Sequence, residues 1–213
     1  MIASIGQICQ AMSMKLTSLS DIRRKELRRA AFKVLQREGL AGATLERVAI
    51  EAGASKGIVL HYFKSKQELF EQVMREANAA LRDEVVLRLK HATTPTERLE
   101  AIVMGNFAPQ FFQPLVCQAW LSLCAEVPRD DKLGKIQKVI HSRMHSNLRS
   151  ALKGIVAYEK VDACALGISM FIDGIWLRCG VTPTDISRVE AIELTARFIT
   201  GITGVYLNSH TWN

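Results

Sequence analysis

The sequence of 213 residues lacks the residue patterns that mark several common classes of protein. Its 5 cysteines are scattered, odd in number and without a Cys-x-x-Cys pair, which argues against a disulfide framework or a zinc site. Walker, Gly-x-Gly-x-x-Gly and His-Glu-x-x-His motifs are also absent. We therefore expect a cytoplasmic protein that is not an enzyme and that has neither a metal nor a cofactor.

Long apolar runs and proline are scarce as well. No stretch reaches the about 18 uninterrupted apolar residues of a membrane helix, and residues 1–16 lack the basic start of a signal peptide. With 5 prolines, 48% hydrophobic residues and 23% charged residues, the composition argues against disorder. Length and composition together predict a soluble, uncleaved protein with one large or two modest domains.

The excess positive charge lies in the first third of the chain. Residues 1–66 contain 12 Lys and Arg against 5 Asp and Glu, whereas residues 67–213 contain 16 basic and 16 acidic residues. A small cationic head on a neutral body is typical of a module that binds a polyanion and is attached to a second domain.

The spacing of apolar residues predicts an all-α protein of about nine helices. Serine or threonine caps and terminal glycines place the first four helices at residues 20–39, 44–53, 55–63 and 65–91. Capping boxes at residues 94–97 and 182–185 begin two later helices. Pro109, Pro114, Pro128 and the polar residues 157–160 mark breaks between the others.

This pattern divides the chain into three parts. Residues 1–17 are expected to be a flexible tail, residues 18–66 a three-helix DNA-binding head, and residues 67–213 a bundle for ligand binding and dimerisation. The two short helices of the head, joined by a glycine-containing turn, predict a helix-turn-helix whose second helix enters the DNA major groove.

Helical periodicity divides that second helix into two faces. Val59, Tyr62 and Phe63 can pack inward, while Lys56, Gly57, Leu60 and His61 share the opposite face. Lysine and histidine can donate to phosphates or base edges, leucine can contact a thymine methyl, and glycine permits close approach to the groove wall. The opposite face is therefore the predicted reading face.

Phosphate contacts are expected around this helix. Thr44 and Ser55 begin helices and can offer N–H and hydroxyl groups to an anion, and Lys64 and Lys66 flank the start of the fourth helix. The basic run over residues 23–29 can equally be a solvated helix face, but its proximity to the helix-turn-helix favours DNA contact. The predicted DNA-binding residues are Arg23, Arg24, Lys25, Thr44, Ser55, Lys56, Gly57, Leu60, His61, Tyr62 and Lys66.

Residues 44–69, TLERVAIEAGASKGIVLHYFKSKQEL, resemble the N-terminal signature of the TetR family of bacterial repressors. The similarity extends over about residues 23–70. It implies an all-α homodimer that binds an operator in double-stranded DNA. It also implies a C-terminal ligand-binding domain whose last two long helices form a four-helix dimer interface.

Shorter motifs resemble one subgroup, the choline-responsive repressors of glycine-betaine synthesis genes. They lie at residues 22–25, 57–63, 81–83, 105–107, 119–121 and 172–178. The resemblance implies that choline or a related quaternary ammonium releases the protein from DNA. The chain differs from the subgroup at Leu123-Cys124, where aromatic residues are expected, and in the segment Phe111-Phe112.

A quaternary ammonium has no N–H to donate, so aromatic faces and a nearby carboxylate must hold it. Asp173 is placed to supply the charge, because it precedes Trp176 by three residues on one helix. The predicted ligand-binding residues are Phe107, Phe111, Trp120, Asp173 and Trp176. The alternative is that the tryptophans are core residues and that Asp173 bonds Arg178 or a neighbouring helix.

Two smaller clusters favour ordinary structural roles. His141 and His145, four residues apart, can share a metal, but a solvated helix face is favoured because no third ligand is evident. Cys117 and Cys124 can sense oxidants, but small apolar packing is favoured because no basic residue is near them to lower a thiol pKa.

Two other functions remain open at this point. One is a TetR-type regulator of efflux or catabolic genes that senses a different hydrophobic or cationic ligand. The other is a helical-bundle protein that does not bind DNA, although residues 90–213 show no set of acid, base and nucleophile.

Overall fold

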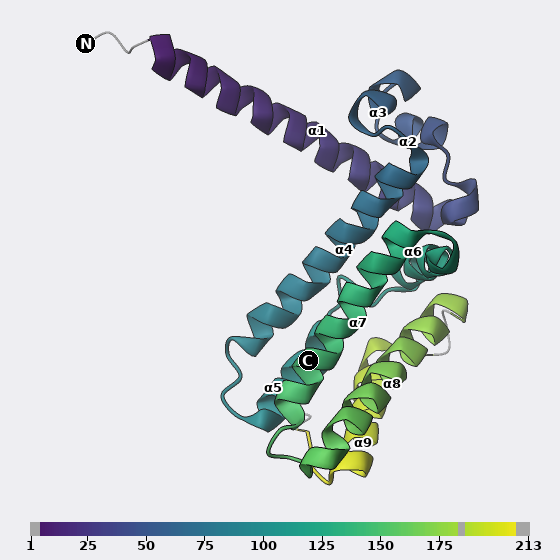
Figure 1. Cartoon of the computed structure of the whole chain (residues 1–213). Helices are drawn as coiled ribbons and strands as arrows, with labels where there is room; N and C mark the ends of the chain where they lie inside the picture. Colours follow the sequence, from purple (N-terminus) through teal and green to yellow (C-terminus); the bar gives the residue numbers. More distant parts are fainter. Residues whose placement is uncertain (1–4, 183–185, 208–213) are drawn as a thin grey trace. The chain divides into compact units, whose positions relative to one another are not determined.

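The computed structural model describes the backbone of residues 5–182 and 186–207, and the side chains of residues 19–182 and 186–207. These residues form nine α-helices, two short 3-10 helices and no strand, which confirms the predicted all-α class (Figure 1). The elements are α1 (Ile5–Gly42), α2 (Leu45–Glu51), α3 (Lys56–Tyr62), α4 (Lys66–Leu89), α5 (Pro95–Asn106), α6 (Pro114–Cys124), η1 (Val127–Arg129), α7 (Asp131–Leu152), η2 (Tyr158–Lys160), α8 (Val161–Val181) and α9 (Arg188–Thr203).

The chain divides into two compact units, Met1–Val73 and Met74–Asn213. The boundary between them falls within α4. The predicted boundary, between residues 66 and 67, falls at the first residue of the same helix. The roles assigned to the two parts stay predictions at this point.

The first helix starts earlier than the sequence pattern predicts. α1 begins at Ile5, so Ser20 lies inside the helix and is not its cap. The physical reason is that residues 5–19 contain no proline and only Gly6 as a helix breaker. The flexibility predicted for residues 1–17 stays a prediction. Near its other end the helix is interrupted at the expected place, because Gly39 takes a left-handed φ of 64°.

The first unit has a core built from the apolar faces of α1, α2, α3 and the start of α4. α2 packs against both α1 and α3. The largest buried residues here are Leu27, Leu35, Val48, Val59, Phe63, Leu69 and Phe70. Their positions agree with the predicted helical periodicity, so a small three-helix head is fixed by apolar packing.

Most of the predicted helix starts are confirmed. The Thr44 hydroxyl accepts from Arg47 N–H at 3.3 Å, and the Ser55 hydroxyl accepts from Ile58 N–H at 3.2 Å. Thr94 and Glu97 form a complete capping box at α5. The start predicted at residues 182–185 lies largely outside the described residues, and α9 is capped by Ser187 with Glu190.

The second unit is organised around α8. This helix packs against α6, α7 and α9, and its residues Ile168, Ile172 and Ile175 are buried between them (Figure 1). The segment Tyr158–Val181 is long and apolar enough to cross a membrane by length and composition alone, with 39% of it buried inside the structure. Its apolar composition matches its place at the centre of a helical bundle.

A glycine permits the close approach of α5 and α4. A Cβ added to Gly105 would lie 2.6 Å from Val85 Cγ2 and 2.9 Å from Val85 Cα. The Val85 backbone cannot move away without disturbing α4. Gly105 therefore sets the position of the end of α5, where Asn106 and Phe107 lie.

We predict that Gly105→Ala lowers the free energy of unfolding by about 1–3 kcal/mol, because the added methyl overpacks the contact with Val85. Gly134→Ala in α7 is the matched control, since a Cβ at Gly134 would lie 3.6 Å from the Val127 carbonyl oxygen of η1, an ordinary contact distance. This control should leave stability unchanged or raise it by up to about 1 kcal/mol. Urea denaturation followed by circular dichroism measures both, and equal stability of the two variants would contradict the prediction.

Candidate DNA-binding and ligand-binding sites

Helix α3 presents its predicted reading face to solvent. The exposed residues are Lys56, Gly57, Leu60 and His61. Val59 and Phe63 are buried beneath them, and Tyr62 is half-buried. The predicted division of α3 into an inner and an outer face is confirmed. Leu60 exposes 41% of its surface, so an apolar side chain stands among polar ones where base edges would be read.

An acidic residue accompanies the reading face. The Glu46 carboxylate, from α2, is paired with the Lys56 ammonium. The hydrogen bond from Lys56 lowers the pKa of Glu46 below its usual range. Glu46 therefore stays ionised at neutral pH, and DNA would approach a lysine that already has a carboxylate partner.

Two of the predicted phosphate-binding cations hold the head together. Arg24 Nη1 donates to the Tyr62 carbonyl at 2.7 Å, and its guanidinium lies 5.5 Å from the centre of the Phe63 ring. Lys66 Nζ donates to the Leu40 carbonyl at 2.5 Å. The carbonyl oxygens at helix ends carry partial negative charge, so both contacts stabilise the chain before any DNA binds.

The remaining predicted contacts are more accessible. Lys25 is exposed, and Arg23 pairs with Glu26 of its own helix at 2.7 Å. Thr44 and Ser55 are exposed, and because their oxygens accept capping hydrogen bonds, their hydroxyl hydrogens can still be donated. DNA contact by any of these residues stays a prediction.

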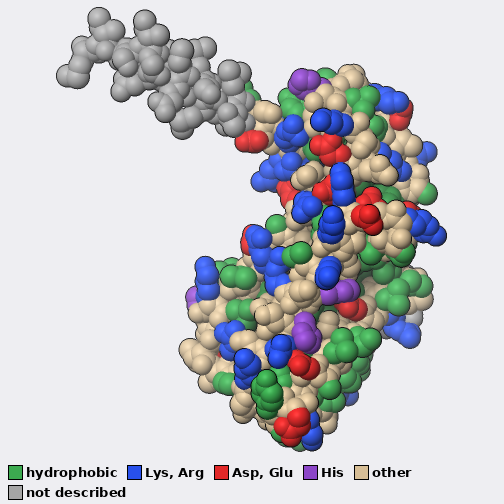
Figure 2. Space-filling model, in the orientation of Figure 1, with side chains coloured by type: hydrophobic (Ala, Val, Ile, Leu, Met, Phe, Trp, Pro, Cys, Tyr) green, Lys and Arg blue, Asp and Glu red, His purple; other side chains and the backbone are tan. Residues whose placement is uncertain are grey.

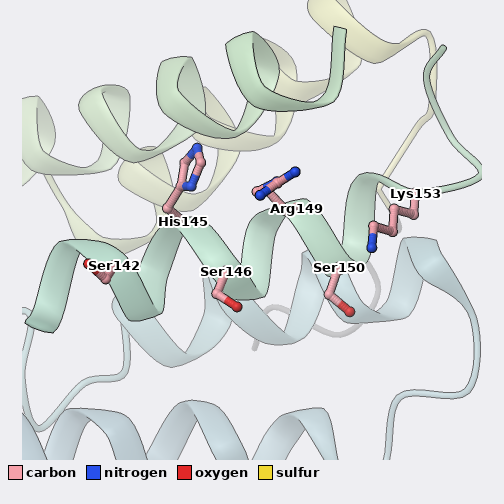
Figure 3. Close-up of a pocket in the computed structure, with 6 residues that line it drawn as sticks. All are labelled: Ser142, His145, Ser146, Arg149, Ser150 and Lys153. Atoms are coloured by element: carbon pink, nitrogen blue, oxygen red, sulfur yellow. The ribbon is translucent and has the colours of Figure 1, made fainter. Parts of the chain in front are cut away.

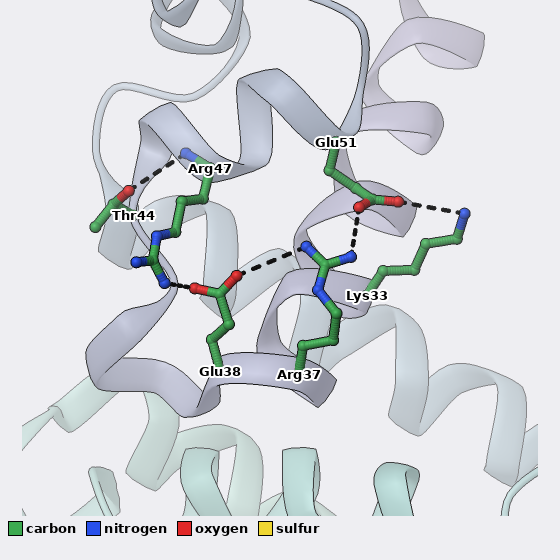
Figure 4. A network of polar contacts seen from close by, with 6 residues as sticks. All are labelled: Lys33, Arg37, Glu38, Thr44, Arg47 and Glu51. Atoms are coloured by element: carbon green, nitrogen blue, oxygen red, sulfur yellow. Dashed lines mark hydrogen bonds and ion pairs between the residues drawn. The ribbon is translucent and has the colours of Figure 1, made fainter.

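Sequence reasoning missed an ion-pair network between α1 and α2 (Figure 4). Glu51 accepts from Arg37 at 2.7 Å and lies 3.5 Å from Lys33, and the Arg37 contact lowers the Glu51 pKa. Glu38 pairs with Arg37 at 3.6 Å and also with Arg47. Figure 2 shows red side chains among the blue ones over this head. Three of the cations in residues 1–66 thus share two carboxylates within the head.

Residues 53–57 read Gly-Ala-Ser-Lys-Gly and so match the Gly-x-Ser-x-Gly motif of hydrolase nucleophiles. In hydrolases this serine follows a strand, whereas Ser55 lies between α2 and α3 and caps α3. Its hydroxyl accepts from Ile58 N–H. The match therefore belongs to the turn of a helix-turn-helix.

Three aromatic rings gather at the end of α5. The Phe112 ring lies 5.0 Å from the Phe107 ring and 6.0 Å from the Trp176 ring, edge to face in both contacts. Trp176 Nε1 donates to the Asn106 carbonyl at 3.2 Å. Phe107 and Phe112 are buried and Trp176 is half-buried. The structure thus brings the predicted residues Phe107 and Trp176 together with Phe112, while Phe111 is half-buried outside this cluster and its role in ligand binding stays a prediction.

Asp173 lies at a junction of three helices. Its Oδ2 is 3.8 Å from His141 Nε2 of α7, and both side chains are 54% exposed. Partial burial raises the pKa of Asp173, and the His141 ring opposes this rise. The contact agrees with the alternative in which Asp173 bonds a neighbouring helix.

The third helix at this junction is α6. Burial raises the pKa of Cys124 to about 12, and the charge of Asp173 adds to the rise. Trp120 precedes Cys124 by one helical turn and therefore shares its face. Trp176 follows Asp173 by three residues on α8, and Trp120 lies on α6, which packs against α8. Phe111 and Trp120 take no part in the ring contacts among the described residues.

The described cysteines are free and Cys117 and Cys179 are buried. Burial also raises the pKa of Cys117, with the nearby Cys179 adding to it. Protonated, buried thiols react slowly, so packing is the role that the geometry supports. Among the described residues, no cluster of three His, Cys, Asp or Glu side chains is placed to hold a metal ion.

Comparison with known proteins agrees with this arrangement. Residues 27–73 match the model of the bacterial regulatory proteins of the tetR family, and residues 95–204 match the BetI-type transcriptional repressor C-terminal domain. The chain is 34% identical over 190 residues to the HTH-type transcriptional regulator BetI of Escherichia coli K12, covering 88% of this chain and 97% of that protein.

Solved structures share the fold at lower identity. A putative transcriptional regulator from Saccharomonospora viridis in complex with choline aligns with a TM-score of 0.72 and 18% identity over 83% of this chain and 94% of that one. The regulator FadR from Bacillus subtilis in complex with stearoyl-CoA aligns with a TM-score of 0.69 and 17% identity over 85% and 99%. The fold alone therefore accommodates different ligands.

These matches define a ligand-responsive, DNA-binding repressor of the helix-turn-helix class. The chain belongs to the TetR family, and its C-terminal half is of the BetI type.

We predict that Glu46→Gln tightens operator binding about two- to fivefold, because it removes a carboxylate beside the phosphates and frees Lys56. Fluorescence anisotropy with labelled duplex at fixed salt measures the effect. The control is the same change in a Lys56→Gln background, where the gain should be much smaller. A gain of equal size in both backgrounds would show that Glu46 does not act through Lys56.

Proposed function

We propose that this TetR-family repressor binds its operator as a cytoplasmic homodimer and is released by choline or a related quaternary ammonium. The observation that carries the proposal is the Asp173 carboxylate, which is 54% exposed and precedes Trp176 by three residues on α8, the helix that packs against the Trp120 helix α6. A cation with an apolar surface is matched by one negative charge beside aromatic faces. The BetI-type C-terminal half and the choline complex of a protein with the same fold support this ligand.

The aromatic residues would have different roles in holding the ligand. Trp176 is anchored through its N–H to the Asn106 carbonyl, so its ring is held in a fixed orientation. Phe107 and Phe112 are buried behind it and serve as packing support. Trp120 would supply the opposing face, since it lies on α6 and has no ring partner among the described residues. Phe111 is half-exposed and would lie at the edge.

Release from DNA would follow from differential binding. A ligand weakens DNA affinity only if it binds the DNA-incompetent state better. Asp173 belongs to α8, and its partners lie on α6 and α7. A cation that replaces His141 as the neighbour of Asp173 would therefore change the packing among these helices. In the head, Lys56, Leu60 and His61 would read the operator.

A different effector is the second candidate. The aromatic trio is well packed, and stearoyl-CoA is bound by another protein of this fold. Both observations favour a hydrophobic ligand and a regulator of catabolic or efflux genes. The two candidates differ in one respect, because only a cation requires the charge of Asp173.

The homodimer is inferred from an exposed apolar face on α8. Leu166, Met170, Leu177 and Val181 recur at helical spacing and expose between 51% and 64% of their surfaces. A Cβ added to Gly174, on the same face, would meet nothing within 4 Å. Val189 and Leu194 extend apolar exposure onto α9. Two copies of such a face would bury each other in a four-helix interface.

We predict that Asp173→Asn weakens choline binding about tenfold or more, because it removes the charge and keeps the shape. Trp176→Phe should bind with intermediate affinity, since phenyl is a weaker cation-binding face. Calorimetry with 3,3-dimethylbutan-1-ol, the uncharged isostere of choline, is the control, and its affinity should not depend on Asp173. Absence of choline binding to the wild-type protein at millimolar concentration would favour a different effector.

We predict that Met170→Glu converts the dimer to a monomer at micromolar concentration, because it places a charge within the apolar face. Tyr158→Glu is the matched control, since Tyr158 is 79% exposed but precedes α8 and lies outside that face. Light scattering reports the mass of each. A wild-type monomer, or a Met170→Glu dimer, would contradict the proposed interface.

A further inference from the structure

A groove on the outer face of α7 is not explained by DNA binding, choline binding or dimerisation. It encloses about 390 Å³ and is lined by Ser142, His145, Ser146, Arg149, Ser150 and Lys153 (Figure 3). We call it the α7 groove. Serines recur every four residues along it, and so do His145, Arg149 and Lys153, so two parallel rows of donors run along one helix.

Neighbouring helices contribute to both sides of the α7 groove. Arg98 Nη2 of α5 donates to Ser150 Oγ at 3.4 Å. Arg149 Nε lies 2.6 Å from Asp162 Oδ1 of α8. Figure 3 shows His145 and Arg149 directed to one side of α7 and Ser146 and Ser150 to the other. The groove therefore has donors along both of its edges.

The charge of the α7 groove is unusual for this part of the chain. Residues 67–213 have equal numbers of acidic and basic residues, yet α7 carries five Lys and Arg against one Asp. None of the six lining residues is acidic. Figure 2 shows blue and purple side chains along the position of α7 in Figure 1. The excess of basic over acidic residues is thus a property of α7 and not of the composition of residues 67–213 as a whole.

Arg149 is incompletely satisfied. Its Nε is close to Asp162 but makes no hydrogen bond of acceptable geometry and is buried. The Asp162 side chain is 65% exposed, so the carboxylate can return to water at low cost when another anion takes its place. A buried guanidinium N–H without a well-aligned acceptor favours an anionic ligand.

We propose that the α7 groove binds a small phosphate-bearing molecule. Arg149, Lys153 and the adjacent Arg98 supply three positive charges against one from Asp162, and a phosphate monoester of about −1.5 to −2 charge balances this excess. Ser146 and Ser150, one helical turn apart, can donate their hydroxyl hydrogens to oxygens of one phosphate, while Ser142, two turns from Ser150, would contact another part of the molecule. The volume of the groove, about 390 Å³, suits a small molecule.

Calorimetry on the full-length protein at constant ionic strength tests the proposal, with inorganic phosphate and glycerol 3-phosphate as probes and chloride as the balancing salt. We expect saturable binding of at least one probe. Arg149→Gln and Lys153→Gln should each weaken it about tenfold. Lys153 is exposed at the end of α7, so its variant tests the site even if loss of Arg149 disturbs packing against α8. Tighter binding of the ester would identify a metabolite as the ligand, and equal binding would identify inorganic phosphate.

Lys90→Gln is the matched control, because Lys90 is exposed, follows α4 and does not line the groove. It should change probe affinity less than about twofold. The proposal is overturned if neither probe shows saturable heat up to about 10 mM. It is also overturned if Lys90→Gln weakens binding as much as Lys153→Gln does. Equal loss of operator affinity in the Lys153 variant would reassign the groove to nucleic acid.

Discussion

The packing of three helices against α8 is the constraint on which the second unit depends. Ile168, Ile172 and Ile175 occupy the inner side of α8, and Gly180 lets the α6 backbone approach so closely that an added Cβ would lie 3.0 Å from Cys117 C. Because these contacts fix the orientation of α8, they also fix the positions of Asp173 and of the exposed apolar residues on its other faces. One helix thus serves the core, the candidate cation site and the candidate dimer face, and each use limits the substitutions that the others can tolerate.

Several charged side chains of the head form contacts within the protein, which a count of charges in the sequence does not reveal. Glu38 and Glu51 neutralise cations of α1 and α2, and Arg24 is committed to the end of α3. Exposed ion pairs of this kind contribute little individually to stability, but they fix which side chains remain free to meet DNA. We therefore expect fewer cations to contact DNA than the basic composition of residues 1–66 suggests, and we expect these contacts to centre on α3 and the exposed part of α1.

The sequence predicted those features that depend on near neighbours. Caps at Thr44, Ser55 and Thr94 could be identified because donor and acceptor are three residues apart, and Gly39 because a left-handed turn requires it. Partners across helices could not be identified, and the contact of Asp173 with His141 is an example. Phe111 and Phe112 are neighbours in a turn that has no helical periodicity. The sequence therefore offered no signal that decides which of the two rings is buried.

The hydrogen bond from Arg24 to the Tyr62 carbonyl links the end of α3 to α1. We therefore expect a rearrangement of α1 to move α3 with it. Under the proposed function, operator choice would depend on the outer face of α3, and the response to the ligand would depend on residues of the second unit. Exchange of Lys56, Leu60 and His61 for other side chains would give regulators with new operators and the same inducer, a separation on which modular biosensors can be built.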